Sequence, residues 1–327
     1  MSATSRAAGA EALVEALGPS FAGRIERDFP LARLTTYRVG GAAYVYVEPS
    51  SMDDVELLAR ALRDHHAPVL ALGRGSNLVV SDRGFPGIVL RLGAGFSWIE
   101  PADVGDLGGG GLRAGAATTL PVLANFAARR SLAGLEFMVA VPGSVGGAVR
   151  MNAGAHGSEI SDTLVSCTLF DLEELRVNER PVQKLGYSYR RSNLTARHVV
   201  LEARFALKRD EQDAIKARME SFRRHRAATQ PGAVQNAGSV FKNPPGDSAG
   251  RLVEAAGLKG FRVGGAAVSE LHANFFIAGE GSSAQDVFDL VQAVRARVVE
   301  VHGVHLEPEI RFVGRFEDKE RVEVDGT

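Results

Sequence analysis

The chain has 327 residues, of which 45% are hydrophobic and 24% are charged, and its net charge is −1 at pH 7. The length suggests two or three domains, and the absence of a basic excess argues against a nucleic-acid-binding protein. A single cysteine, Cys167, excludes an intrachain disulfide and favours a reducing compartment. Because no run of about 18 apolar residues occurs, we expect a cytoplasmic protein that does not enter a membrane.

The first third of the chain predicts an α/β layer. We expect residues 1–30 to form a loosely held leader or a short helix. Val55, Leu58 and Leu62 recur at helical spacing after Ser51, which predicts a helix capped by that serine. Apolar runs beside glycine-rich turns predict strands at residues 43–47, 68–72 and 88–92, and residues 106–111 a flexible hairpin-like loop.

The remainder predicts further strands and longer helices. We expect a helix from near Pro121, then strands at residues 164–170 and 199–207, and a domain boundary near residue 209. Apolar stripes predict helices around residues 215–222, at 250–256 and after Ser283, where Asp286 completes a capping box and Gly303 ends the helix. Residues 306–313 alternate like a strand.

Three glycine-centred segments are candidates for close backbone approach to a phosphate-bearing ligand. They are residues 73–77, 142–155 and 238–245, and each also contains serine or asparagine. None matches the Rossmann or P-loop fingerprint, and structural turns would have a similar composition. The density of glycine in residues 142–155 argues against a packed helix there.

Two charged patterns are candidates for anion binding. Arg190 is flanked by Tyr189 in a way that suits a carboxylate, although an interdomain salt bridge is equally compatible. Glu309 and Arg311 leave the same face of a predicted strand, where they are either solvated or a paired site. His302 and His305 lack further ligands, so we expect no metal site.

Seven segments, in order, resemble the UDP-N-acetylenolpyruvoylglucosamine reductase (MurB) family. They are TTYRVGGAA (residues 35–43), GRGSNLVVSDRGFPGIVLRL (73–92), GLEFMVAVPGSVGGAVRMNAGAHG (134–157), YSYRRSN (187–193), GSVFKNP (238–244), SELHANFF (269–276) and LEPEIRFVG (306–314). The resemblance covers nearly the whole chain except its two ends. The short interval between GSVFKNP and the helix at 250–256 resembles the branch without an extra tyrosine-bearing loop.

The resemblance implies a mixed α/β and α+β fold, with an FAD-binding unit of the vanillyl-alcohol-oxidase (PCMH) type before an α+β substrate-binding domain. The implied limits are a leader at 1–30, an FAD-binding unit at 31–208 that splits near 92, a substrate-binding domain at 209–315 and a tail at 316–327. FAD would bind non-covalently. The residues implied to bind it are Tyr37, Arg38, Gly73, Arg74, Gly75, Ser76, Asn77, Leu78, Pro142, Gly143, Ser144, Gly146, Gly147, Asn152, Ala153, Gly154 and Arg311.

The resemblance also implies a reaction. NADPH would reduce FAD, and the reduced flavin would pass a hydride to the enolpyruvyl group of a UDP-sugar in peptidoglycan precursor synthesis. Arg190 and a protonated Glu309 would stabilise the charge that develops on the substrate carboxylate, and Ser239 would protonate its α-carbon. The implied substrate-binding residues are Tyr189, Lys242, Asn243, Lys259 and Asn274.

Two other functions would use part of the same pattern. An FAD-dependent sugar oxidase would share only the cofactor motifs, and GSVFKNP and LEPEIRFVG argue against it. A catalytically silent nucleotide-sugar binder would not need Arg190, Ser239 and Glu309 together. We expect a monomer in which Arg191 is structural.

Overall fold

The computed structural model describes residues 3–65, 67–105, 109–232 and 234–317. Contacts between Cα atoms divide the chain into two compact units. The first contains residues 1–27, 45–74 and 87–226, and the second contains residues 28–44, 75–86 and 227–327. The domain limits expected from the sequence stay a prediction.

Most of the first unit is built on two sheets. The larger antiparallel sheet has the order β12-β11-β13-β7-β6, and β8 also pairs with β13. Its strands are β6 (Ile99–Ala102), β7 (Gly110–Gly115), β8 (Leu132–Ala133), β11 (Leu164–Asp171), β12 (Arg176–Pro181) and β13 (His198–Arg209). The other sheet has the order β1-β2-β5-β3, with strands β1 (Arg24–Pro30), β2 (Ala42–Glu48), β3 (Val69–Ala71) and β5 (Phe85–Leu90).

Helices cover both sheets of this unit. Helices α1 (Ala3–Leu17) and α2 (Met52–His65) lie side by side in both figures. Helices α3 (Leu120–Ala128) and α4 (Val145–Met151) bury apolar side chains in one core with β7, β11 and β13. The strands β9 (Gly154–Ala155) and β10 (Ser158–Glu159) form a small hairpin, and α5 (Gln212–Thr229) follows the large sheet.

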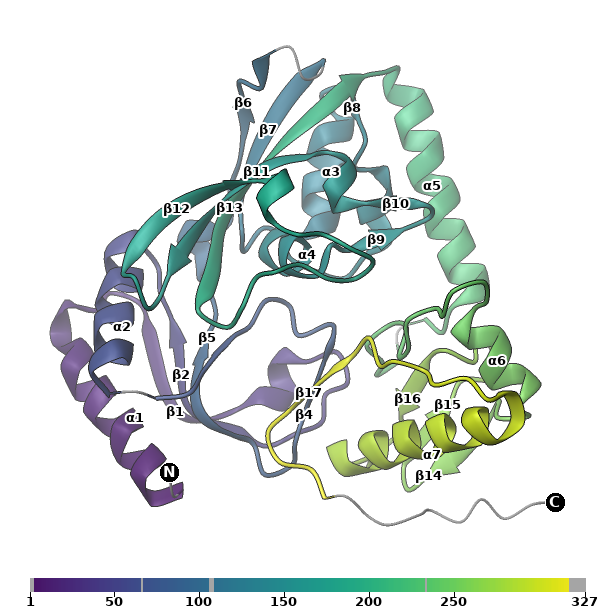
Figure 1. Ribbon diagram of the computed structural model, residues 1–327. Helices are drawn as coiled ribbons and strands as arrows, with labels where there is room; N and C mark the ends of the chain where they lie inside the picture. Colours follow the sequence, from purple (N-terminus) through teal and green to yellow (C-terminus); the bar gives the residue numbers. More distant parts are fainter. Residues whose placement is uncertain (1–2, 66, 106–108, 233, 318–327) are drawn as a thin grey trace. The chain divides into compact units, whose positions relative to one another are not determined.

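The second unit has its own apolar core. Its antiparallel sheet has the order β14-β15-β16, from β14 (Arg262–Val263), β15 (Ala266–Val268) and β16 (Phe276–Ala278). Helix α7 (Ala284–His302), yellow in Figure 1, packs along β14 and β15, and α6 (Ala249–Ala255) contacts α7. The strands β4 (Leu78–Val80) and β17 (Arg311–Val313) pair in parallel. Short 3-10 helices occur in the chain at Gly18–Ser20, Leu31–Leu34, Ala94–Phe96, Glu136–Ala140, Ile160–Asp162 and Val182–Lys184.

Most predicted elements are confirmed, including the Ser283–Asp286 capping box of α7 and the left-handed Gly303 that ends it. Residues 106–108 of the predicted loop lie outside the described residues, and β7 begins at Gly110. None of the described helices combines the length and apolar character that a membrane span requires. Within the described ranges, no three His, Cys, Asp or Glu side chains are grouped to hold a metal ion.

Three expectations about local structure were wrong. Residues Arg24–Pro30, expected in a leader, form an edge strand beside β2. The glycine-rich segment does contain a helix, α4, because Ser144 caps it and three of its apolar side chains are buried in the core. The predicted strand at 306–313 is regular only at Arg311–Val313, since Pro308 has no N–H to donate and makes an isolated bridge with Phe241.

Candidate active site

The first unit contains a pocket that joins two of the predicted glycine-centred motifs. Gly73 and Arg74, which follow β3, lie on its wall together with Ser144, Gly146 and Gly147 from α4 and its N-cap. Sequence reasoning missed the other polar residues of this wall, Arg91, Arg150 and His198. Arg150 lies within the glycine-rich segment 142–155 but was not singled out there, whereas Arg91 follows the end of β5 and His198 begins β13.

The glycines of this pocket are required partly by the protein itself. A Cβ atom at Gly73 would lie 2.6 Å from the Oγ of Ser144, and one at Gly146 would lie 3.0 Å from the Cβ of Ala116. At Gly147 the nearest atom would be the Ser144 Oγ at 3.5 Å, an ordinary contact, so space remains there. The Ser144 Oγ accepts a hydrogen bond from the Gly147 N–H at 3.4 Å, which fixes the start of α4.

Arg190 lies at the tip of a tight turn in the first unit. Its φ of 55° is left-handed, an unusual conformation for a residue with a side chain. Its Nη2 donates to the Gly154 carbonyl at 2.6 Å, and its guanidinium lies 4.9 Å from the centre of the Tyr189 ring. Asn152, buried and also left-handed, donates to the Ser188 carbonyl at 3.3 Å and so joins the end of α4 to this turn.

Some predicted cofactor residues of the first unit lie outside the pocket wall. They are Pro142, Gly143, Asn152, Ala153 and Gly154. Gly143 packs against Leu120, since a Cβ there would lie 3.1 Å from the leucine Cδ1. Their contribution to cofactor binding stays a prediction.

The second unit brings Ser239 and Glu309 to one place. Ser239 makes a bridge with Phe275, and the next residue, Val240, accepts the Glu309 N–H at 2.7 Å. Asn77 completes the arrangement, because its Nδ2 donates to the Glu309 carbonyl at 3.0 Å and its own carbonyl accepts from Arg311 at 3.0 Å. Two predicted catalytic residues and two predicted cofactor residues therefore share one backbone network.

Tyr37, a predicted cofactor residue of the second unit, is the last of three consecutive residues with buried hydroxyls. The hydroxyls of Thr35, Thr36 and Tyr37 are buried without a hydrogen-bond partner, and burial raises the pKa of Tyr37 above its ordinary range. The Thr36 N–H donates to the Gly75 carbonyl at 3.2 Å. Gly75 itself is left-handed, and a Cβ there would lie 2.0 Å from the Leu34 carbonyl oxygen.

The remaining predicted cofactor residues of this unit flank the same segments. Arg38, with a φ of 55°, follows Tyr37, and Ser76 lies between Gly75 and Asn77. Leu78 is the register partner of Arg311 in the parallel pair of β4 and β17.

The predicted substrate-binding residues of the second unit already have partners in the protein. The Lys242 Nζ lies 2.6 Å from Glu307, and the Lys259 Nζ lies 2.7 Å from Glu254. Asn243 accepts the Ala249 N–H at 3.0 Å at the start of α6. Asn274 is buried and binds both the N–H and the carbonyl of Phe241, at 2.9 and 2.8 Å.

Known proteins are similar to both parts of the chain. Residues 43–174 match the FAD binding domain family, and residues 230–313 match the UDP-N-acetylenolpyruvoylglucosamine reductase C-terminal domain family. The UDP-N-acetylenolpyruvoylglucosamine reductase of Sphingopyxis alaskensis is 43% identical over 303 residues, which are 91% of this chain and 98% of that protein. The corresponding protein of Bacillus subtilis is 38% identical over 306 residues, covering 93% and 99% of the two chains.

A solved structure agrees with these sequence matches. The crystal structure of UDP-N-acetylenolpyruvylglucosamine reductase from Thermus caldophilus is 38% identical and has a TM-score of 0.75. The match covers 89% of this chain and 100% of that one. The chain therefore belongs to the UDP-N-acetylenolpyruvoylglucosamine reductase family of FAD-dependent oxidoreductases.

Proposed function

We propose that this protein reduces UDP-N-acetylglucosamine enolpyruvate to UDP-N-acetylmuramate, with NADPH as the electron donor, in peptidoglycan precursor synthesis. The observation that carries the proposal is the network of Ser239, Glu309 and Asn77 in the second unit. In this network the backbone next to Ser239, the proposed proton donor, bonds to Glu309, and Glu309 bonds to Asn77, which the family resemblance assigns to the cofactor. A protein that only bound a nucleotide sugar would not need this combination.

The residues present fit FAD. In the first unit, the pocket presents the side chain of Arg74 and the open face of Gly147, with Gly73, Ser144 and Gly146 beside them. In the second unit, Tyr37 has a buried hydroxyl with no partner in the protein, as a bound polar group would require. When bound, FAD supplies the hydride that adds to the methylene carbon of the enolpyruvyl group.

Other residues complete the proposed cofactor site. Those of the first unit lie outside the pocket wall, and two of those in the second unit, Leu78 and Arg311, belong to β4 and β17. They are Pro142, Gly143, Asn152, Ala153 and Gly154 in the first unit, and Arg38, Gly75, Ser76, Asn77, Leu78 and Arg311 in the second.

Ser239 is the proposed proton donor. Hydride addition leaves negative charge on the substrate carboxylate and the adjacent α-carbon, which is then a strong carbon base. A serine hydroxyl is a weak acid, but it can protonate such a centre when it is held at the right position. The bridge to Phe275 and the bond between Val240 and Glu309 fix the backbone on both sides of Ser239.

Arg190 and Glu309 are the proposed stabilisers of the substrate carboxylate. The left-handed turn and the bond to the Gly154 carbonyl fix the direction of the Arg190 side chain. A protonated Glu309 would donate a second hydrogen bond to the carboxylate. Both residues lower the barrier only if their hydrogen bonds strengthen as the charge develops.

The UDP-sugar is proposed to contact Tyr189, Lys242, Asn243, Lys259 and Asn274. The ammonium group of Lys242 pairs with the exposed carboxylate of Glu307, and that of Lys259 pairs with the exposed carboxylate of Glu254. Because exposed ion pairs are weak, either lysine could exchange its carboxylate for a diphosphate of the substrate. Tyr189 is 46% exposed, and a ring at the surface can stack on a base or a sugar. Asn274 would act mainly through the backbone of Phe241.

Further features of the family are proposals for this chain. Four residues, Pro245 to Ser248, separate GSVFKNP from α6, which supports the branch without the tyrosine-bearing loop. We also propose a monomer, with the domain limits given by the sequence.

Separate measurement of the two half-reactions tests the proposal. In Ser239→Ala, NADPH should still bleach the flavin absorbance, because this step needs no proton from Ser239. Reoxidation by the enolpyruvyl substrate should slow by at least about a hundredfold, as expected when a positioned proton donor is lost. Ser248→Ala, which removes the N-cap hydroxyl of α6 in the same unit, is the matched control and should keep both rates within about threefold.

Two results would contradict the assignment. Equal slowing of both half-reactions in Ser239→Ala would show that the hydroxyl does not act in the proton-transfer step. A wild-type protein that neither binds FAD nor oxidises NADPH in response to the enolpyruvyl UDP-sugar would rule out the proposed reaction.

A further inference from the structure

Three arginines lie on the wall of the pocket in the first unit. They are Arg74, Arg91 and Arg150, and among the described residues no aspartate or glutamate lines this pocket. Buried apolar residues such as Leu90 and Val199 form another part of the wall. An excess of cations beside an apolar surface favours a ligand that carries both negative charge and an apolar part. The pocket therefore suits a dinucleotide, and the three arginines are candidates to contact its phosphates.

Arg150 shares one face of α4 with two glycines of the pocket. Gly146 and Gly147 precede it by four and three residues, which places all three on the same side of the helix, and all three line the pocket. A long side chain on a helix extends over the turn that precedes it. The Arg150 side chain therefore lies beside the space that Gly147 leaves open, where an added Cβ would meet only an ordinary contact.

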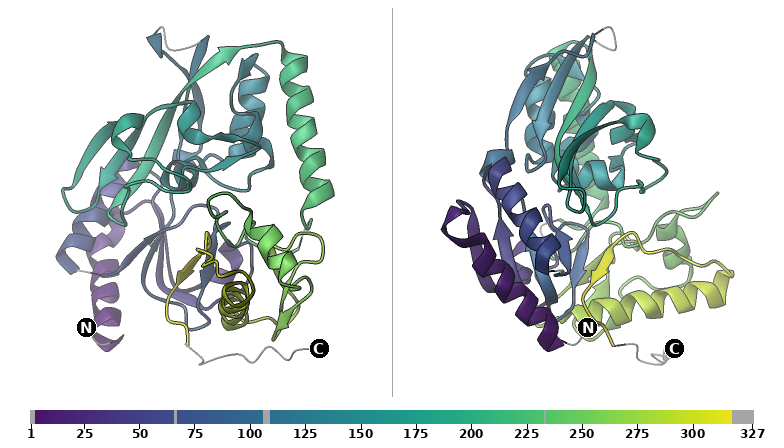
Figure 2. Two further views of the ribbon diagram at one scale, coloured as in Figure 1. Left: turned by 45° about the vertical axis from the view of Figure 1, so that its right-hand side comes forward. Right: turned by 60° about the vertical axis from the view of Figure 1, so that its left-hand side comes forward.

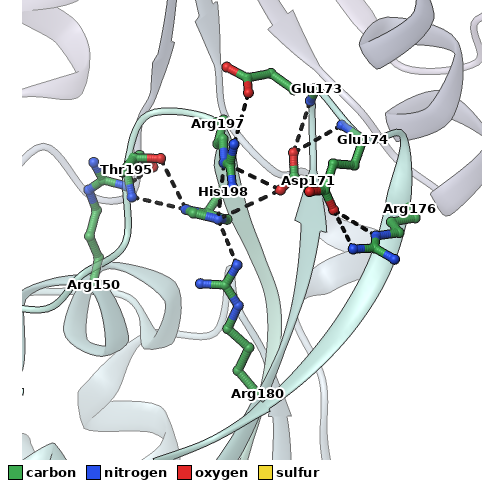
Figure 3. Close-up of polar contacts among 9 residues, drawn as sticks. All are labelled: Arg150, Asp171, Glu173, Glu174, Arg176, Arg180, Thr195, Arg197 and His198. Carbon is green, nitrogen blue, oxygen red and sulfur yellow. Dashed lines mark hydrogen bonds and ion pairs between the residues drawn. The ribbon is translucent and has the colours of Figure 1, made fainter. Parts of the chain in front are cut away.

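The direction of the Arg150 guanidinium is fixed by the turn before β13 (Figure 3). Its Nη1 donates to the Thr195 carbonyl at 2.7 Å, and the Ser192 hydroxyl donates to the Arg150 carbonyl at 2.6 Å. A guanidinium carries five N–H donors in one plane, so the same group can bind a carbonyl and a phosphate oxygen. The protein itself thus holds Arg150 at the pocket.

The Thr195 carbonyl is in turn held by the buried His198. The His198 N–H donates to this carbonyl at 3.2 Å, and the Thr195 N–H donates to the His198 Nδ1 at 3.0 Å. His198 is 4% exposed and is paired in register with Asp171 of β11. The turn that orients Arg150 is therefore anchored in the large sheet. This role needs only a lone pair on Nδ1, which a neutral ring supplies.

We propose that Arg150 is a further cofactor-binding residue, whose guanidinium donates a charge-assisted hydrogen bond to a phosphate oxygen of the flavin dinucleotide. The Thr195 carbonyl orients the guanidinium for this contact. Arg74, which follows β3, lies on the same pocket wall and contributes to the same positive field. The inference rests on the proposed function only in taking FAD as the ligand of this pocket.

The chemistry of the contact predicts its size and its salt dependence. A charge-assisted hydrogen bond to a phosphate changes an affinity by about ten- to hundredfold. Dissolved ions screen such a contact where water reaches it, so FAD should bind less tightly as ionic strength rises. Lysine keeps the charge but lacks the planar set of donors, so it can replace arginine only in part.

Titration of the apoprotein with FAD at low and high salt, followed by flavin fluorescence, tests the contact without measuring turnover. Arg150→Gln should raise the Kd at low salt by about ten- to hundredfold and should weaken its salt dependence. Arg150→Lys should lose less affinity and should keep the salt dependence of wild type. The matched control is Arg176→Gln, because Arg176 is exposed on β12, pairs with Glu174 at 2.6 Å and lies outside the pocket wall. This variant should bind FAD within about twofold of wild type.

Three results would overturn the inference. They are a wild-type affinity for FAD that does not change with ionic strength, an unchanged Kd in Arg150→Gln, and equal losses in Arg150→Gln and Arg150→Lys with the salt dependence unaltered. Circular dichroism of the apoproteins checks that the fold is retained, and the wild-type salt dependence tests the contact even if a variant does not fold. NADPH also carries phosphates, so an unchanged FAD affinity with a raised KM for NADPH in the Arg150→Gln holoenzyme would assign Arg150 to the electron donor. Failure of wild type to bind FAD at all would instead contradict the proposed function.

Discussion

Asn274 uses its amide to hold the backbone of Phe241 in the second unit. Asn274→Ala would leave a buried N–H and a buried carbonyl without partners, which costs about 2–4 kcal/mol of the free energy of unfolding. Because Ser239 lies two residues from Phe241, flavin reoxidation by the substrate should also slow. Urea unfolding of the second unit and stopped-flow absorbance measure the two effects.

The matched control for this substitution is Asn236→Ala. Its amide is half-exposed and bonds the Val234 carbonyl and the Gly238 N–H at the surface. Water can replace these bonds, so stability should change by no more than about 1 kcal/mol. Equal losses in the two variants would mean that burial of the Asn274 amide has no special effect.

At the scale of single residues, the family motifs identify some residues of the site, and others are identified only from the fold. The resemblance brought Ser239 and Glu309 into one hypothesis, and the structure places them in one backbone network. His198 could not be found, because nothing in its sequence neighbourhood distinguishes a pocket wall from an ordinary strand end, and Arg150 was passed over although it lies within the glycine-rich segment 142–155. Such residues become candidates only after the fold assembles them.

At the scale of elements, the N-terminus of α7 depends on a residue distant in sequence. Asp82 accepts the N–H groups of Ala284 and Gln285 at 2.9 and 3.0 Å, in addition to the local capping box of Ser283 and Asp286. Asp82→Ala should lower the free energy of unfolding of the second unit by about 1–2 kcal/mol, because two helix donors lose their acceptor. Thermal or urea unfolding followed by circular dichroism measures the loss.

Glu280→Ala serves as the comparison for Asp82→Ala. Glu280 is exposed and lies just before the same helix, so its removal should change stability by less than about 0.5 kcal/mol. If both variants were equally stable, the contacts of Asp82 would contribute nothing to α7.

The capping box of α7 shows what an element's own sequence can predict, and Asp82 shows what it cannot. Helices with a clear apolar stripe and caps, such as α2 and α7, follow from local spacing. α4 was missed because its glycines have low helix propensity, and the tertiary packing of Val145, Ala148 and Val149 overrides it. The edge strand β1 was missed because its polar residues show no clear alternation, and only pairing with β2 defines it.

At the scale of the whole molecule, buried carboxylates link the stability of the first unit to pH. Asp54 is 1% exposed and accepts the N–H groups of Ala22 and Ser50, both at 2.8 Å, and the Ser50 hydroxyl. Burial would raise the pKa of this carboxyl, but the bonds from Ser50 and Ala22 outweigh it, and the pKa is lowered. The pKa of Asp171 is lowered in a similar way.

A lowered pKa fixes the sign of the pH effect. The folded state holds these two protons less tightly than the unfolded chain, so their contribution is complete above the ordinary aspartate pKa of about 3.9. It is lost as pH falls from there through the folded-state values, and the free energy of unfolding of the first unit should decrease steeply below about pH 4. Asp54→Asn should be less stable at neutral pH and should show a shallower decrease, because the amide has no proton to gain. Urea titrations at several pH values measure both slopes, and parallel curves for wild type and Asp54→Asn would show that Asp54 does not contribute to acid unfolding.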